Sequence, residues 1–394
     1  MNPHPRVLLC IGTRPEIIKM APVFRALKKT TLQPLVLHTG QHDEKSLPLY
    51  RFFEMDPGDS LGLNRDRESL GHLTAVMLDY LDAVIRELSP DAILVQGDTT
   101  SALSAALIAF YNKIPIGHVE AGLRSHNAYN PFPEEKNREL IARLSHWHFA
   151  PTEQSVINLK SEGIDERRIF QVGNTVVDAA QWGLEHLDRY FDDPAVKTVL
   201  PLERLDALDT SRLILITAHR RENWQGPIAE VAEGVKRVLR AHKDVIILWP
   251  VHPNPSVQQT VRNAMQGLEE DSARRLLLTP PLNYPELLWV LKKSWLTLTD
   301  SGGIQEESVT ARVPVLVLRK TTERPEVLRI GAGALIGTSP VAICEWVDRL
   351  TEQPELHQQM RSLASPFGNG HSGEAIAGIL EAELTASYKA AQQS

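Results

Sequence analysis

The sequence predicts an α/β protein made of two Rossmann-like domains whose parallel sheets face each other across a cleft. Short, continuous apolar runs alternate with longer helical patterns, which is typical of parallel strands covered on both faces. This alternation occurs twice, and an acidic, turn-rich segment at residues 183–211 separates the two series. The chain has 394 residues, which favours two domains over one core.

The two series place the expected strands and the domain boundary. In the first series, strands are expected at residues 6–12, 32–40, 91–98, 115–122 and 147–152, and helical patterns at 17–29, 99–113 and 136–147 and in a stretch ending at Phe53. In the second, they are expected near residues 212–220, 244–252, 275–282, 294–303 and 314–326. We expect residues 1–176 to form the N-terminal domain, completed by a C-terminal helix at 370–394, and residues 177–369 to form the other. The hinge is expected at 174–185.

The composition excludes several functional classes. A formal charge of -7 and a pI near 6.1 do not suggest general binding to nucleic acid or to anionic membranes. Cys10 and Cys344 lie in separate apolar segments, so neither a disulfide framework nor a CxxC metal site is expected. No apolar run reaches the roughly 18 residues that span a bilayer. We therefore expect a cytoplasmic enzyme or binding protein without metal.

A possible anion site follows the first expected strand, in the stretch "CIGTRPEIIKM". Gly12 permits a sharp turn there, and the helix that follows begins with unpaired backbone N–H groups. Arg14 and Lys19 add positive charge. An ordinary strand-to-helix turn with two surface cations remains the alternative. The P-loop and GxGxxG patterns are both absent, so no dinucleotide fingerprint is present.

Three acids lie at strand or helix ends in the N-terminal half. Asp98 ("GDTTS"), Glu120 ("GHVEAG") and Glu134 ("PFPEEKNR") come from three segments expected at one edge of the sheet. Each has a structural alternative: Asp98 as a helix cap, Glu120 paired with Arg124, and Glu134 in a helical salt bridge with Arg138. Together they favour proton transfer.

The second half supplies candidate anion-binding residues. His219 directly follows a strand and precedes Arg220 and Arg221, which favours an anion site or an acid–base group. His252 lies in the proline-rich turn "PVHPNP", and no metal constellation surrounds it.

The stretch "TDSGGIQEE" combines glycines with acids. Ser301, Gly302 and Gly303 can present N–H groups to a phosphate at a helix start. Either Glu306 or Glu307 could accept the hydroxyls of a ribose, with Arg324 as a compensating cation. The alternative is that the acids only favour the helix dipole.

These motifs resemble those of a known family. "GTRPEIIKMAP", "GDTTS", "GHVEAGLRS", "PFPEEKNR", "GNTVVD", "HRREN", "PVHPNP", "TDSGGIQEE" and "TTERPE" are similar, in order from about residue 7 to 337, to those of the bacterial non-hydrolysing UDP-N-acetylglucosamine 2-epimerases. The resemblance implies a GT-B-like fold, a cytoplasmic homodimer, no cofactor, and a supply of UDP-N-acetylmannosamine to surface polysaccharide synthesis.

The chemistry of C2 epimerisation accounts for the residue types. The C2 hydrogen is too weakly acidic for direct removal, and no NAD fingerprint supports a keto intermediate. The remaining route eliminates UDP to give 2-acetamidoglucal and then adds UDP back, with the proton delivered to the opposite face of C2. It requires a firm grip on the diphosphate and acid–base groups on both faces.

The resemblance also implies roles for individual residues. It assigns catalysis to Asp98, Glu120, Glu134 and His219. It assigns substrate binding to Arg14, Lys19, Arg138, Ser301, Gly302, Gly303, Glu307 and Arg324, and it favours Glu307 over Glu306 for the ribose. Some members bind a second UDP-N-acetylglucosamine as an activator, and Gln41, Glu134, Arg220 and His252 match positions suggested for that site.

Two regions depart from the family pattern, and other functions compete. Leu282 and Leu287 stand where uridine contacts often fall, and Glu44 replaces a neutral amide that many members carry near the activator residues. The competing enzymes are a hydrolysing epimerase, which releases N-acetylmannosamine and UDP, and a GT-B glycosyltransferase. A non-catalytic nucleotide-sugar sensor is the alternative outside enzymes.

Overall fold

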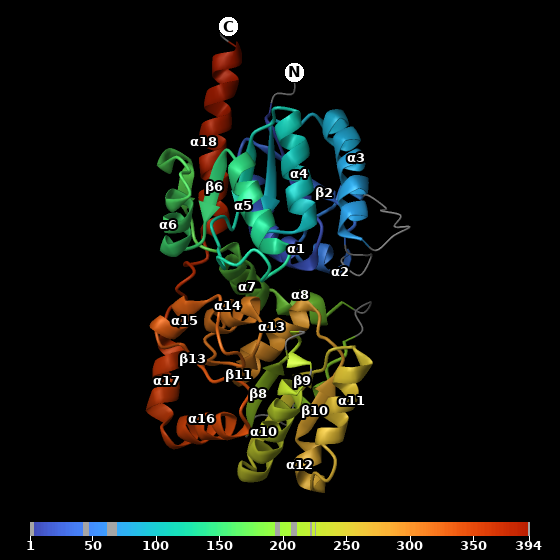
Figure 1. The fold of residues 1–394 in the computed structure, drawn as a ribbon, viewed down its shortest axis with the longest axis vertical. Coiled ribbons are helices and arrows are strands. Elements are labelled where there is room, and N and C mark those ends of the chain that lie inside the picture. The colour runs from blue at the N-terminus through green and yellow to red at the C-terminus, as the bar shows by residue number, and fades with distance from the viewer. Residues whose placement is uncertain are drawn as a thin grey trace. The chain divides into compact units, whose positions relative to one another are not determined.

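The structure divides the chain into two compact units. A computed structural model describes residues 4–41, 47–60, 69–193, 198–205, 211–220, 223–224 and 226–392. Met1–Ala179 and Phe367–Ser394 form unit 1, and Ala180–Pro366 form unit 2 (Figure 1). The predicted α/β class with parallel sheets is confirmed in both units. Glu44 and Arg221 lie outside the described residues.

Unit 1 is built around a parallel sheet that has seven strands among the described residues, in the order β3-β2-β1-β4-β5-β6-β7. Its strands are β1 (Arg6–Ile11), β2 (Gln33–His38), β3 (Asp59–Ser60), β4 (Ala92–Gln96), β5 (Ile116–Val119), β6 (Trp147–Ala150) and β7 (Ile169–Gln171). Its helices are α1 (Arg14–Leu27), α2 (Leu47–Phe52), α3 (Leu70–Leu88), α4 (Thr100–Tyr111), α5 (Glu134–Leu144), α6 (Glu153–Ser161) and α18 (Ser372–Gln392), with a 3₁₀ turn at Glu166–Arg168. Helix α7 (Thr175–Glu185) contains the division between the units.

Unit 2 repeats this plan with a parallel sheet in the order β10-β9-β8-β11-β12-β13. Its strands are β8 (Arg212–Thr217), β9 (Val245–Pro250), β10 (Leu276–Thr279), β11 (Ser294–Thr299), β12 (Val315–Val317) and β13 (Gly333–Leu335). Its helices are α8 (Leu187–Phe191), α9 (Leu202–Leu205), α10 (Pro227–Ala241), α11 (Pro255–Ala264), α12 (Glu270–Arg274), α13 (Tyr284–Lys293), α14 (Gly302–Thr310), α15 (Pro325–Arg329), α16 (Pro340–Glu352) and α17 (Pro354–Ser362). The segment at 183–211, expected to be a turn-rich connection, thus carries α8 and α9.

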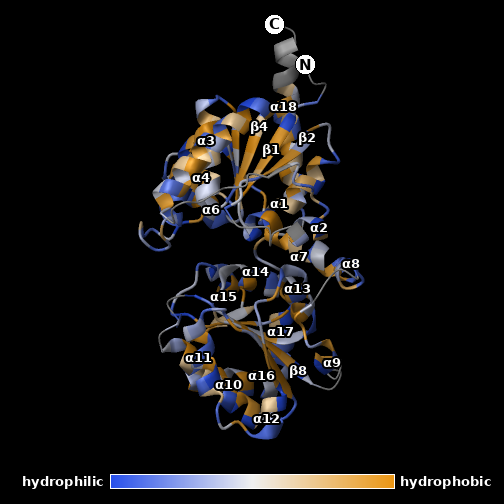
Figure 2. Ribbon diagram, turned by 90° about the vertical axis from the view of Figure 1, so that its right-hand side faces the viewer, coloured by the Kyte–Doolittle hydropathy of each residue, from blue (hydrophilic) through white to orange (hydrophobic). Residues whose placement is uncertain are grey.

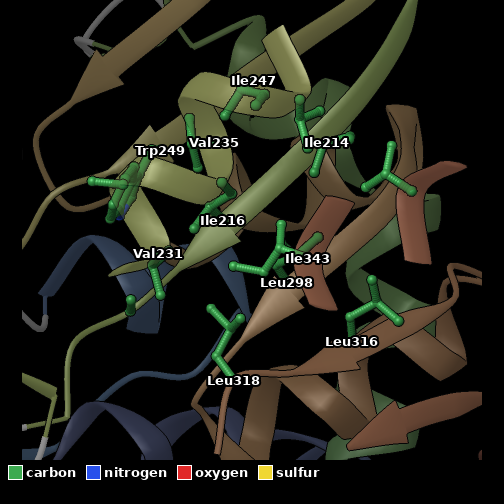
Figure 3. Close-up of a cluster of buried hydrophobic side chains, with 14 of the residues drawn as sticks. Ile214, Ile216, Val231, Val235, Ile247, Trp249, Leu298, Leu316, Leu318 and Ile343 are labelled. Atoms are coloured by element: carbon green, nitrogen blue, oxygen red, sulfur yellow. The ribbon is translucent and has the colours of Figure 1, made fainter. Parts of the chain in front are cut away.

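The buried faces of the strands and helices form the cores. Hydrophobic residues run along the strands, while the hydrophilic positions lie on the outer surfaces of the helices (Figure 2). In unit 2, Ile214 and Ile216 of β8 lie beside Leu298 of β11 and against Ile343 of α16 (Figure 3). Because these side chains are almost fully buried, β8 and β11 are held in place by a well-packed core.

Both sheets reverse their strand order at one internal pair of neighbours. In unit 1 this switch lies between β1 and β4, and in unit 2 it lies between β8 and β11. Ligands of open α/β sheets bind outside the carboxyl ends of the strands at such switch points. Gly12 and Asp98 follow the switch strands of unit 1, and His219 and Ser301 follow those of unit 2.

Helix α18 returns the end of the chain to unit 1, where it lies against α1 (Figure 1). Gly373 makes this close approach possible, because a Cβ at this position would lie 2.7 Å from the backbone of Pro22. The backbone N–H of Gly373 also donates to Asp178 Oδ1 at 2.8 Å. The C-terminal helix is therefore part of the packing of unit 1.

Candidate active site

Glu120 of unit 1 directly follows β5 and is buried among polar side chains. The Nζ of Lys19 lies 2.6 Å from both of its carboxylate oxygens. Gln96 Nε2 donates to Oε2 at 2.5 Å, and Asn174 Nδ2 donates to Oε1 at 2.9 Å. These donors come from α1, from the end of β4 and from the segment before α7, so distant parts of the chain converge on one carboxylate.

The backbone of Glu120 is held in the left-handed region, with a φ of 64°. This conformation costs a residue with a Cβ roughly 1–2 kcal/mol. Gly97 lies opposite, and a Cβ on it would be 3.7 Å from Glu120 Oε2. Strain of this kind persists only where the surroundings enforce it, and it concentrates at functional sites.

Asp98 forms a second cluster with the first turns of α5. Arg138 Nε donates to Asp98 Oδ2 at 2.6 Å, and Arg138 Nη1 lies 3.1 Å from the buried Glu135. Asn137 Nδ2 donates to the backbone oxygen of Asp98 at 2.8 Å. Burial raises the pKa of Asp98 above its ordinary value and the nearby Glu120 adds to this, although Arg138 lowers it.

Glu135 is a fixed point of this cluster. It accepts hydrogen bonds from the backbone N–H groups of Ser125, at 2.9 Å, and of His126, at 2.8 Å. Burial alone would raise the pKa of Glu135, but these donors and the charge of Arg138 hold it below its ordinary value. Glu135 therefore acts as a carboxylate anchor for Arg138.

Two structural alternatives for the acids are excluded. The cap of α4 is Thr99, whose hydroxyl accepts from a backbone N–H of the first turn, rather than Asp98. Arg124 pairs with Glu162, with Nε 2.6 Å from Oε1, rather than with Glu120. Asp98 and Glu120 are thus not accounted for by capping or by that ion pair.

Glu134 is the first residue of α5 and is partly exposed. The alternative of a salt bridge with Arg138 is also wrong, because Arg138 pairs with Asp98 and Glu135. Within the described ranges, the Glu134 carboxylate has no hydrogen-bond or ion-pair partner. In this respect Glu134 differs from Glu120 and Asp98, whose carboxylates accept hydrogen bonds from described side chains.

The turn between β1 and α1 is organised by Glu16, which the sequence reasoning missed. Its buried carboxylate accepts from the backbone N–H of Gly12 at 3.1 Å and from the hydroxyl of Thr99 at 2.9 Å. Burial raises the pKa of Glu16 to about 7. A Cβ on Gly12 would lie 2.1 Å from the hydroxyl of Ser101, so only glycine fits there. Arg14 is half-buried at the start of α1.

Gln41 contacts the beginning of α4. Its Oε1 accepts from the backbone N–H of Ser101 at 3.1 Å and from its hydroxyl at 2.6 Å. The same hydroxyl lies 2.8 Å from Thr39 Oγ1. This predicted activator residue therefore lies beside the turn that carries Asp98.

His118 and His148 are buried register partners on β5 and β6. His118 Nε2 lies 2.8 Å from the backbone oxygen of Gly97. Burial lowers the pKa of His118 to about 4 and that of His148 to about 3. Both rings are therefore neutral near pH 7. His118 contacts the backbone of Gly97, the residue before Asp98.

In unit 2, the start of α14 has the features of an anion site. Ser301 caps the helix, and its hydroxyl accepts from the backbone N–H of Ile304 at 3.4 Å. A Cβ on Gly303 would meet no atom within 4 Å, and one on Gly302 would meet Glu323 at 3.7 Å. The backbone N–H groups of Ser301 and Ile304 donate within the turn, to Thr299 Oγ1 and Ser301 Oγ, whereas the space beside Gly303 is open to a ligand of negative charge.

The two glutamates of α14 have different partners. Glu306 is fully buried and pairs with Arg324 Nε. Glu307 lies beside Tyr284, whose pKa burial and the Glu307 carboxylate raise well above its ordinary value. Arg324 therefore neutralises Glu306 directly, although we expected it to balance the acid that holds the ribose.

The loop after β8 is fixed by Asp300, a second residue that the sequence reasoning missed. The backbone N–H groups of His219 and Arg220 each donate to Asp300 Oδ2 at 2.9 Å, and Asn223 Nδ2 donates at 2.8 Å. Asp300 is fully buried, whereas 47% of the His219 side chain is exposed. Arg220 also lies 3.4 Å from Glu323.

His252 lies close to this loop. Its Nδ1 accepts from the backbone N–H of Asn254 at 3.1 Å, and its ring is 4.9 Å from that of Trp224. Trp224 Nε1 in turn donates to the backbone oxygen of His219 at 3.0 Å. The predicted residues His219, Arg220 and His252 thus lie in one neighbourhood of unit 2.

Comparisons with known proteins show what the chain resembles. The family described as UDP-N-acetylglucosamine 2-epimerase matches residues 25–381. The UDP-N-acetylglucosamine 2-epimerase of Yersinia pestis is 41% identical over 373 residues, which cover 94% of this chain and 97% of that protein. The chain belongs to the UDP-N-acetylglucosamine 2-epimerase family.

Solved structures of this family share the fold. The UDP-GlcNAc 2-epimerase of Neisseria meningitidis, crystallised with UDP-GlcNAc, is 38% identical, with a TM-score of 0.85 over 95% of this chain and 99% of that one. The enzyme of Methanocaldococcus jannaschii, in complex with UDP-GlcNAc and UDP, is 34% identical, with a TM-score of 0.75 over the same shares. The GT-B-like expectation is thereby confirmed.

Membrane spans and metal sites are two further features that bear on function. In the part of the chain that the structure describes, no helix is both long and apolar enough to cross a membrane. In the same part, no group of three or more His, Cys, Asp and Glu side chains is arranged to hold a metal ion.

Proposed function

We propose that the protein reversibly epimerises UDP-N-acetylglucosamine at C2 by eliminating UDP and adding it back. The observation that carries the proposal is Glu120, a carboxylate in a strained backbone conformation within reach of the Lys19 ammonium. A group held in this way is preorganised for proton transfer. Family membership supports the substrate, since relatives of known structure carry UDP-GlcNAc or UDP in their crystals.

The two sets of groups that the reaction requires are both present. Asp98, Glu120 and Glu134 are available for proton transfer on the two faces of C2, and the burial-raised pKa of Asp98 suits an acid. The start of α14, with His219 of the same unit, is suited to hold the diphosphate while it is leaving group and then nucleophile. We assign the ribose to Glu307, because Glu306 is already neutralised by Arg324.

The decisive experiment is exchange of the C2 hydrogen. The enzyme is incubated with UDP-N-acetylglucosamine in deuterated water, and the products are followed by proton NMR. We expect deuterium at C2 of both UDP-sugars and little free sugar or UDP. Stoichiometric release of UDP with N-acetylmannosamine would establish the hydrolysing reaction instead, and binding of UDP without any exchange would indicate a sensor.

We also propose that a second UDP-N-acetylglucosamine activates the enzyme through Gln41, Arg220 and His252. The contact of Gln41 with the start of α4 connects this residue to the turn of Asp98. Initial rates should then rise sigmoidally with substrate, and His252→Ala should make the dependence hyperbolic. Hyperbolic rates in the unaltered enzyme would contradict the activator site.

We further propose a cytoplasmic homodimer that supplies N-acetylmannosamine units to surface polysaccharides. Support for self-association comes from large apolar side chains that are exposed on neighbouring helices of unit 1: Tyr80 on α3, Phe110 and Tyr111 on α4, and Leu140 on α5. Two isolated cysteines fit a reducing compartment. Sedimentation of the protein, with Tyr111→Glu as the variant, tests the dimer: a monomer in the unaltered protein contradicts it.

A further inference from the structure

His219 and Asp300 are neighbours because their strands are neighbours. Thr217 of β8 is the register partner of Thr299 of β11, and the two hydroxyls lie 2.6 Å apart. The backbone N–H of Asp300 donates to the oxygen of Thr217 at 3.1 Å. Ile216 and Leu298, each one residue before these threonines, belong to the buried core of unit 2 (Figure 3). Asp300 is thus held rigidly at the switch point of the sheet.

The two oxygens of Asp300 have different surroundings. Oδ2 accepts from the backbone N–H groups of His219 and Arg220 and from Asn223 Nδ2. Oδ1 lies 3.3 Å from His219 Nδ1 and 3.2 Å from the His219 backbone nitrogen. Among the described residues, no Lys or Arg side chain pairs with this fully buried carboxylate. Its charge is compensated by N–H groups of one loop and by the histidine ring.

A buried carboxylate beside one ring nitrogen determines where a neutral imidazole carries its proton. The contact of Oδ1 with Nδ1 is at a charge-pair distance of 3.3 Å, and the negative charge of Oδ1 favours a proton on Nδ1 of His219. Nε2 then carries the lone pair and can receive or return a proton. Trp224 Nε1 donates to the backbone oxygen of His219, and this hydrogen bond also restrains the His219 backbone.

We propose that Asp300 is a positioning residue that holds His219 in the Nδ1–H tautomer and so presents Nε2 as its proton-accepting nitrogen. Within the proposed epimerisation, Nε2 accepts a proton from solvent as substrate binds and donates it to a diphosphate oxygen as the C1–O bond breaks. The proton returns to Nε2 when UDP adds back. The role of Nε2 in this cycle rests on the proposed function, whereas the tautomer itself does not.

Asp300→Asn separates this role from support of the loop. The amide oxygen at the Oδ2 position keeps the three donors from His219, Arg220 and Asn223. The amide nitrogen at the Oδ1 position donates to His219 Nδ1 and therefore moves the ring proton to Nε2. Asn223→Ala is the matched control, because it removes one donor to Oδ2 and leaves Oδ1 beside the ring.

The tautomer is measured by long-range proton–nitrogen NMR on full-length protein with labelled histidine, and His219→Gln assigns the signal. We expect Nδ1–H in the unaltered protein and in Asn223→Ala, and Nε2–H in Asp300→Asn. In the deuterium exchange assay, Asp300→Asn should lower kcat roughly tenfold or more, with KM changed less than about twofold. Asn223→Ala should keep most of its kcat.

Nε2–H in the unaltered protein overturns the inference even if Asp300→Asn fails to fold. An unchanged tautomer in Asp300→Asn also overturns it. Equal losses of kcat in Asp300→Asn and Asn223→Ala would overturn it too, because they would show that Asp300 only supports the loop. Absence of C2 exchange in the unaltered enzyme would contradict the proposed function and leave the tautomer result standing.

Discussion

Units 1 and 2 share a sheet plan but use their acids differently. In unit 1, Glu120, Asp98 and Glu16 accept hydrogen bonds from side chains that come from other elements of the unit. In unit 2, Asp300 accepts hydrogen bonds mainly from backbone N–H groups of one loop. Near the start of α14, the space beside Gly303 is free of described protein atoms. Buried carboxylates that accept hydrogen bonds from several elements suit proton transfer, whereas backbone N–H groups that face open space suit binding of an anion. The difference indicates how the work is divided between the units.

The largest effect is expected from removing the charge of Glu120. Glu120→Gln should reduce turnover on the order of a thousandfold, because general acid–base catalysis contributes about that much. Its affinity for UDP, measured by calorimetry, should change less than about threefold. Glu162→Gln is the control, since Glu162 forms an ion pair with Arg124 in the same unit. Comparable losses of turnover and UDP affinity would argue for a structural role of Glu120 instead.

Glu16 predicts a pH-dependent stability of unit 1. Its pKa is raised to about 7 when folded, so its contribution is complete below the unfolded value near 4.5 and is lost as the pH rises to about 7. Relative to Glu16→Gln, the unaltered protein should be more stable at pH 4.5 than at pH 8 by about 3 kcal/mol. Urea unfolding at several pH values measures this difference.

His118 contributes with the opposite sign. Because its folded pKa is lowered to about 4, its stabilisation is present above pH 6.5 and is lost as the pH falls toward 4. The two effects oppose each other in the unaltered protein, so Glu16→Gln should reveal a loss of stability in acid. A stability difference between the two proteins that is the same at all pH values would show that the pKa of Glu16 does not change on folding.

The acid that holds the ribose can be identified in unit 2. If Glu307 accepts the ribose hydroxyls, Glu307→Gln should bind UDP roughly tenfold more weakly, the value of a hydrogen bond to a charged group. It should also lose the preference for UDP over 2′-deoxy-UDP. Fluorescence titration with both nucleotides measures this, and a loss of preference in Glu306→Gln alone would reverse the assignment.

The smallest effect is expected at Gly303. Gly303→Ala adds a methyl group that meets no protein atom but occupies the space before the α14 N-terminus. UDP affinity should fall about fivefold, while the melting temperature stays the same or rises, because alanine favours helix over glycine. Gly378→Ala in α18 also meets nothing and should leave UDP binding unchanged. Unchanged UDP affinity in Gly303→Ala would place the phosphates elsewhere.

The sequence was sufficient for the fold class because the strands are continuous apolar runs with helices between them. It also predicted that Glu120, Asp98 and the start of α14 follow such strands, which the structure confirms, while their roles stay predictions. Glu16 and Asp300 were missed for one physical reason. Their partners lie in turns and loops that follow neighbouring strands, and the order of strands in a sheet is not visible in the linear pattern. A search for acids directly after the carboxyl end of each of the two strands at the switch point would have found Asp300.

The partners of Arg138 and Arg324 show the same limit. Spacing on a helix suggested that Arg138 pairs with Glu134, but the tertiary structure pairs it with Asp98 and Glu135. Likewise, no local pattern distinguishes Glu306 from Glu307, and only the position of the Arg324 side chain separates them. Propensity and spacing predict elements well, whereas ion pairs depend on packing between elements.

Helix α18 has a consequence for the order in which the protein is made. The ribosome completes unit 2 at Pro366 before it releases the helix that packs on α1. Unit 1, whose β1 to β7 emerge first, must therefore wait for the last residues of the chain to reach its final packing. A stop codon near residue 366 would leave the turn at the start of α14 intact and destabilise the unit that carries Glu120.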